Sequence, residues 1–221
     1  IPTITIHHNL KTKLQQLTHQ SLFYFKLILT EAPFWAIVIC GGAIIFGNSI
    51  GLRTSYGVDS FPTTYIIVED LQEMSIFFFL LILLFYSGEL IWKERDVKFN
   101  GIFDAVATSD FINLLGKFLG LILSYVVIII ALILSGIIFQ TLNGYYNYEI
   151  GLYFSLFFLG IFPFLVLFTF VAFFFQVLTN HKFLGHIMVV IFIFLSMFLL
   201  PALLKIDHGL LIFGGSGLAP Y

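Results

Sequence analysis

Long apolar segments separated by short polar ones make up most of the chain. A helix needs about 20 residues to cross the roughly 30 Å of hydrocarbon in a bilayer. Five segments reach about that length without the alternation of apolar and polar positions that marks a barrel strand. The pattern predicts a polytopic bundle of transmembrane helices, all α, with spans at about 32–52, 74–92, 114–139, 151–177 and 183–204. Pro163 predicts a kink or tilt in the fourth.

A shorter amphipathic pattern precedes the first span. In residues 9–25, the apolar positions Leu10, Leu14, Leu17 and Phe25 recur at helical spacing, and lysines and glutamines occupy other faces. This predicts an elbow helix that lies on the membrane within a lead-in, residues 1–31, before the transmembrane domain 32–221.

A second amphipathic segment connects the second and third spans. Phe99, Ile102, Phe103 and Val106 are spaced i, i+3, i+4 and i+7, which places them on one face of a helix. The charged run at residues 93–96 comes just before it and predicts ion pairs within the turn, at i,i+3 spacing. From this pattern alone, a plain interfacial helix and a partner-binding helix both remain open.

Composition supports a membrane protein. Of the 221 residues, 60% are hydrophobic and only 10% are charged, and the mean hydropathy is +1.05. A single water-soluble core does not hide that much apolar surface. The formal net charge of -2 gives no reason to expect a nucleic-acid partner.

The basic residues indicate the orientation, because cytoplasmic loops retain Lys and Arg. One side holds Lys11, Lys13, Lys26, Lys93, Arg95, Lys98, Lys117 and Lys182, and the other holds only Arg53 and Lys205. We therefore expect a cytoplasmic N-terminal side. Residues 53–75 are expected to be the longest external connection, and residues 205–221 part of an external segment before a sixth span.

The stretch YSGELIWKERDVKFNGIFDAVATSDFINLLGKFLGL resembles the cytoplasmic connection of type-2 ABC exporter permeases. More narrowly, it is similar to Bacteroidota ABC transporter permeases fused to an M1-family aminopeptidase. The positions that carry the resemblance are Gly88, Glu89, Trp92, Glu94, Arg95, Asp104, Ala105 and Lys117. By this resemblance the chain is most of the second membrane half of a longer protein in the bacterial inner membrane.

The resemblance implies a permease that moves an unknown substrate by alternating access. Its partners would be an ABC ATPase subunit, which holds ATP and Mg²⁺, a second transmembrane half or protomer, and the lipid bilayer. The helix around residues 99–106 would couple to the ATPase, with Glu94, Arg95 and Asp104 among the contacts. The alternative is a membrane anchor, without transport, for an external M1-type peptidase.

Glu89, Trp92 and Lys93 close the second span at the cytoplasmic boundary. An isolated carboxylate is costly to bury in a membrane, so Glu89 is expected to reach the interface or to pair with a cation such as Lys93 or Arg95. A hinge that senses partner movement and a simple interfacial anchor are both consistent with this pattern.

Two glycine pairs have the small-xxx-small spacing that lets helices approach closely, Gly47 with Gly51 and Gly116 with Gly120. Packing inside the bundle is the simpler interpretation, and a dimer face is the other.

No catalytic motif is present in the sequence. His181 and His186 lack the i,i+4 spacing and the intervening Glu of a zinc protease helix, and no P-loop occurs. We expect no enzyme activity, no metal and no cofactor in this chain, with ATP bound by the partner subunit.

Overall fold

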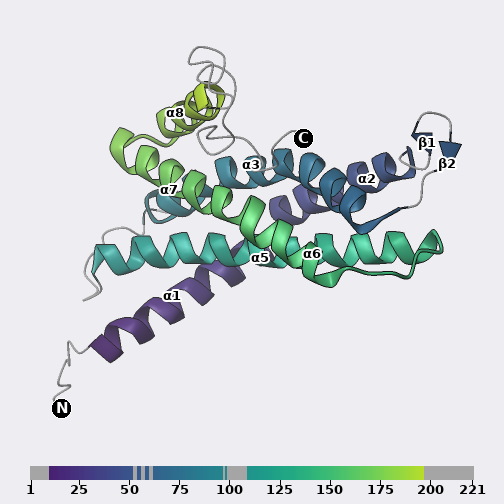
Figure 1. Cartoon of the computed structure of the whole chain (residues 1–221). Helices are drawn as coiled ribbons and strands as arrows, with labels where there is room; N and C mark the ends of the chain where they lie inside the picture. Colours follow the sequence, from purple (N-terminus) through teal and green to yellow (C-terminus); the bar gives the residue numbers. More distant parts are fainter. Residues whose placement is uncertain are drawn as a thin grey trace.

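The computed structural model describes residues 10–51, 54–55, 58–59, 62–96, 98 and 109–196. Its elements, drawn in Figure 1, are α1 (Leu10–Thr30), α2 (Ala32–Gly51), β1 (Thr54–Ser55), β2 (Val58–Asp59), α3 (Thr64–Asp96), α5 (Asp110–Leu142), α6 (Ile150–Ser155), the π-helical η1 (Leu156–Ile161), α7 (Phe162–Thr179) and α8 (Lys182–Phe194). Apart from its connections and an antiparallel hairpin in which β1 pairs with β2, the described chain is helical, as predicted.

Helix α3 lies at the centre of the bundle. It contacts α2, α5, α6, η1, α7 and α8, and Figure 1 shows it between α7 and α2. The core around it is apolar and aromatic, with Phe79, Leu83, Tyr86 and Tyr125 at most 1% exposed. Phe79 and Tyr125 meet edge to face, with ring centroids 5.9 Å apart. This contact joins α3 to α5 in the middle of the bundle.

Membrane character is present in three helices. α3, α5 and the continuous run Ile150–Thr179 are each long and apolar enough to cross a bilayer. Helices α1 and α2 meet at a bend of 64°. If this bent pair forms one broken span, the count among the described residues rises to four. Helix α8 is apolar but shorter, and residues 197–204 of the predicted span 183–204 lie outside the described residues.

Helix α3 begins earlier than the predicted span. Its first residue is Thr64, ten residues before that span, so the predicted connection 53–75 is helical from Thr64 onwards. Within these first turns Ile67, Val68 and Leu71 are buried. The segment is helical because these three side chains fall on one face and pack into the bundle.

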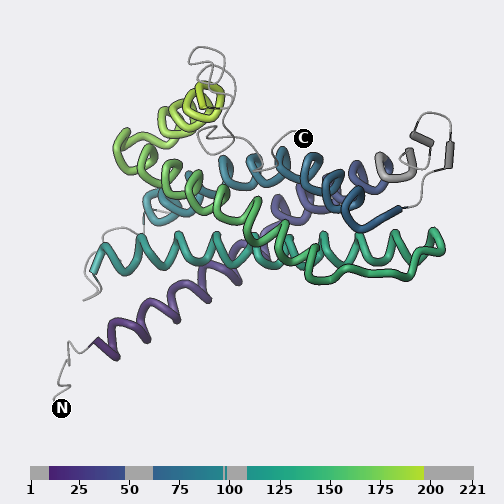
Figure 2. The backbone as a smooth tube through the Cα atoms, in the orientation of Figure 1, coloured from purple at the N-terminus to yellow at the C-terminus, as the bar shows by residue number. Residues whose placement is uncertain are grey.

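Helix α1 extends five residues past the predicted elbow helix and packs along α5. Its half nearer Thr30 holds the buried residues Ser21, Tyr24 and Ile28. Figure 2 shows that the opposite half projects away from the bundle towards the N-terminus. There Leu10 and Leu14 continue the same stripe and are exposed.

The fourth predicted span contains a π-helical segment, Leu156–Ile161, directly before Pro163. A proline ring clashes with the carbonyl four residues earlier in an α-helix, and a wider turn relieves that clash. Nε2 of Gln72 donates a 2.8 Å hydrogen bond to the carbonyl of Leu156. The wide turn is therefore supported from α3.

Candidate functional site

The C-terminal end of α3 carries the densest group of charges in the described structure. We call Glu31, Glu89, Lys93, Glu94, Asp96, Lys117 and Lys182 the charged junction. Its ion pairs tie α3 to α5, to α8 and to the boundary between α1 and α2. The sequence places these residues at four separate points along the chain, so only folding brings them together.

Glu94 is the most enclosed carboxylate of the junction. Nζ of Lys117 donates to Oε2 of Glu94 at 2.5 Å, and the side chains are 5% and 17% exposed. The Tyr24 hydroxyl lies 2.9 Å from Oε1 of Glu94 and 2.7 Å from Oδ1 of Asn113. Glu94 therefore joins α3 to both α1 and α5, in a setting with little water to screen the pair.

Lys182 joins the first residue of α8 to α3. Its Nζ donates to Glu89 at 2.9 Å and to Asp96 at 2.7 Å. Partial burial works to lower the pKa of Lys182, but the hydrogen bonds and charges of Asp96 and Glu89 outweigh it and raise the pKa above its usual value. The ammonium is accordingly charged at neutral pH.

The remaining contacts reach α1 and the turn before α8. Lys93 pairs with Glu31, at the break between α1 and α2. Arg95 donates from Nη1 to Oδ1 of Asn180 at 2.7 Å, and its guanidinium lies 4.8 Å from the centre of the Trp92 ring. Each charge at the end of α3 is thus held by another element.

These contacts correct one prediction and refine another. The charges at residues 93–96 were expected to pair with each other, but Lys93 pairs with Glu31. Glu89 was expected to reach the interface or to pair with a cation such as Lys93 or Arg95, and the cation that it pairs with is Lys182. Helix α3 continues straight through these residues to Asp96, so its side chains point outwards to neighbouring helices.

The predicted coupling residues divide into two groups. Glu94 and Arg95 lie in the last turn of α3. The other predicted members lie outside the described residues, namely Phe99, Ile102, Phe103, Asp104 and Val106. Trp92, from the predicted hinge, is buried and donates to Oε1 of Gln176 on α7 at 3.0 Å.

The predicted glycine pairs also differ from each other. A Cβ on Gly116 would lie 2.8 Å from Cβ of Gln20, and one on Gly120 would lie 2.8 Å from Cβ of Tyr24. These two glycines line the contact between α5 and α1. Gly47 has no such neighbour within 4 Å, and Gly51 is the last residue of α2.

Sequence reasoning missed one residue of the charged junction, Glu31, and three of the residues that hold the end of α3, which are Tyr24, Asn113 and Gln176. Their partners are 62 to 89 residues away along the chain. No spacing of 3 or 4 residues marks such pairs. A glutamine inside the apolar run of α7 was the one available signal, because an unpaired amide in hydrocarbon is costly.

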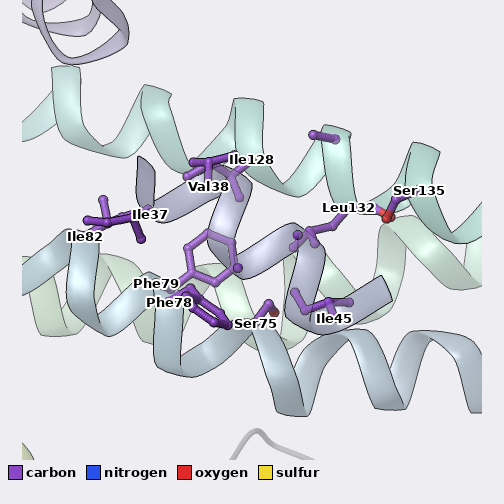
Figure 3. Close-up of a pocket in the computed structure, with 13 residues that line it drawn as sticks. Ile37, Val38, Ile45, Ser75, Phe78, Phe79, Ile82, Ile128, Leu132 and Ser135 are labelled. Carbon is purple, nitrogen blue, oxygen red and sulfur yellow. The ribbon is translucent and has the colours of Figure 1, made fainter. Parts of the chain in front are cut away.

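An apolar pocket lies further along the bundle, between α2, α3 and α5. Figure 3 shows Ile37, Ile45, Phe78 and Leu132 around it, with Ser75 and Ser135 as its hydroxyl groups. Its volume is about 120 Å³. Both serines donate to carbonyls of their own helices. The lining holds no titratable group that could serve as an acid or base.

Metal chemistry finds no support within the described part of the chain. No three residues of the types His, Cys, Asp or Glu come together as a possible metal site among those residues.

Comparisons of the chain with protein-family models, with curated proteins and with solved structures give no match. The charged junction is therefore interpreted from its own geometry.

Proposed function

We propose that the chain is the transmembrane domain of an ABC-2 type transporter, driven by a separate ATPase subunit. One observation carries this proposal. The ion pair of Glu94 with Lys117 joins the end of α3 to the start of α5, and these are the two ends of the connection that holds the predicted coupling helix. A force on that connection acts directly on both helices.

The charged junction would distribute such a force. Through Lys182 the end of α3 is linked to α8, and through Lys93 it is linked to the break at Glu31. Helices joined in this way move as a unit, as a rigid-body alternation of access requires. Glu94 faces the bundle, so we propose that it holds the connection in place and that the segment beyond it contacts the ATPase.

The experiment is purification of the full-length protein in nanodiscs, followed by mass spectrometry of the intact complex. The expected result is an ATP-binding subunit at a fixed ratio. Arg95→Glu with Phe103→Asp should abolish that association, because it reverses a charge and removes an apolar anchor. A matched control is Tyr146→Asp with Asn147→Glu, two exposed positions beyond the opposite end of α5, and it should leave the ratio unchanged.

Two outcomes would contradict the proposal in different ways. If the Arg95→Glu, Phe103→Asp protein retains its ATPase, the coupling segment has been assigned wrongly. If no ATPase accompanies the unmodified protein, the chain serves as a membrane anchor without transport.

A further inference from the structure

A chain of hydrogen bonds with one possible direction joins α3, α7 and α8. Nε1 of Trp92 lies 3.0 Å from Oε1 of Gln176. An indole nitrogen can only donate, so the amide oxygen must face it. The amide nitrogen, Nε2, then faces Nδ1 of His186 at 3.2 Å. Nδ1 has to accept, which makes His186 neutral with its proton on Nε2.

The opposite side of the imidazole is enclosed by backbone. A Cβ on Gly88 would lie 2.5 Å from Nε2 of His186, and a Cβ on Gly185 would lie 2.2 Å from Oε1 of Gln176. Only glycine at both positions lets the ring and the amide come this close. Helix α8 is thereby seated on α3 and α7.

A second proton on His186 has no place in this arrangement. Protonated Nδ1 would face the amide nitrogen of Gln176, with a donor against a donor. Turning the amide over would satisfy His186 but would set the amide nitrogen against Nε1 of Trp92. In either orientation one buried donor loses its acceptor, which is costly in a site of low polarity.

The charged groups near His186 are few. Glu89 on α3 favours a positive ring, and Lys182, one turn earlier on α8, opposes it. Helix α7, Phe162–Thr179, contains no charged residue. The His186 side chain is only partly buried, and the charged junction leads from it to the end of the bundle, so a proton can reach it from water.

We propose that Trp92, Gln176 and His186 form a pH-sensitive latch that seats α8 on α3 and α7 when His186 is neutral and releases α8 when Nδ1 takes up a proton. The proton comes from solvent, and no other reactant is required. The latch regulates how α8 is held, and it does not depend on whether the chain couples to an ATPase.

The test uses Trp92 as its own reporter. The chain has two tryptophans, so Trp35→Phe leaves Trp92 as the only one. In nanodiscs, acrylamide quenching of Trp92 should increase severalfold in a single titration as the pH is lowered from neutral into the acidic range, because histidine takes up a second ring proton on acidification. His186→Asn should abolish this response, because an amide oxygen replaces Nδ1 as the acceptor and does not titrate. The matched control His181→Asn, at an exposed histidine outside the latch, should retain it.

A Trp92 signal that does not change with pH would overturn the proposal, as would a response that survives His186→Asn. If His186→Asn does not fold, Gln176→Glu tests the same proposal. A carboxylate accepts from both Trp92 and a protonated histidine, so acid should then fail to increase quenching. An unchanged acid response in Gln176→Glu would also refute the latch.

Discussion

Gly120 lies where α1 and α5 come closest. A Cβ at this position would be 3.0 Å from the backbone nitrogen of Phe25 and 3.1 Å from the carbonyl oxygen of Ser21. Backbone atoms cannot turn aside as the end of a long side chain can. The position therefore tolerates no side chain unless the two helices separate.

Gly120→Ala should destabilise the protein by about 1–3 kcal/mol, the usual cost of overpacking a tight contact. The measurement is the thermal unfolding midpoint in detergent. Gly47→Ala is the matched control, since its Cβ would meet nothing within 4 Å, and it should leave the midpoint unchanged or slightly higher. Equal midpoints for the two variants would show that α1 does not pack on α5 in this way.

Lys117 is a second position where one side chain decides local stability. Its side chain is 5% exposed and its partner Glu94 is 17% exposed. Removing one member of a buried ion pair leaves an uncompensated charge, whereas removing both charges does not.

Lys117→Met should therefore cost about 3–5 kcal/mol of folding stability. Adding Glu94→Gln should recover most of that loss, because the amide oxygen still accepts from Tyr24. A double-mutant cycle of unfolding free energies measures the coupling. A double variant that is no more stable than Lys117→Met would contradict this explanation, because removing the charge of Glu94 would then relieve no penalty.

At the scale of elements, one glutamine sets where α3 begins. Nε2 of Gln140 on α5 lies 3.0 Å from the carbonyl oxygen of Pro62 and 3.2 Å from Oγ1 of Thr64. Its Oε1 accepts from the Tyr153 hydroxyl at 2.9 Å. The end of α5 and the start of α3 and α6 are thus held at one polar point inside an apolar bundle.

Gln140→Leu should loosen the first turns of α3 and leave its C-terminal half intact, since hydrogen bonds inside membrane proteins contribute about 0.6–1.7 kcal/mol each. Hydrogen–deuterium exchange should show faster exchange of amides 64–70 only. Ser135→Ala, which removes a hydrogen bond within α5 alone, serves as the control. Unchanged protection of residues 64–70 in Gln140→Leu would show that α3 begins independently of Gln140.

At the scale of the whole molecule, α5 orients the bundle. Its 33 residues extend about 50 Å at 1.5 Å per residue, enough to cross a bilayer. The charged junction lies at the start of α5 and the polar point around Gln140 lies near its end. From the bias of Lys and Arg, we expect the junction on the cytoplasmic side.

Single cysteines at the two ends of α5 test this orientation. In a Cys40→Ser background, a membrane-impermeant maleimide should label Tyr146→Cys in intact cells. Ser109→Cys should react only after the membrane is permeabilised. Both side chains are exposed in the structure, so access to reagent is the variable. Labelling of both from outside would exclude α5 as a span, and the reverse pattern would invert the topology.

The sequence by itself determined the helical class of this protein, the presence of apolar helices long enough to cross a bilayer, and the approximate positions of α2, α5 and the run from α6 to α7. Those features depend on the length of each apolar segment and on the spacing of its residues, which are properties of the local sequence. The helical turns of α3 before the predicted span were not predicted. Only the tertiary structure showed which face of α3 is buried.

The charged junction and the Trp92–Gln176–His186 contact were likewise decided only by the tertiary structure. Glu94 pairs with Lys117, which is 23 residues away along the chain. Trp92 donates to Gln176, which is 84 residues away. Such pairs carry no periodic signal, because they form where separate helices cross. A charge beside a membrane must be paired, but the packing of the helices selects the partner.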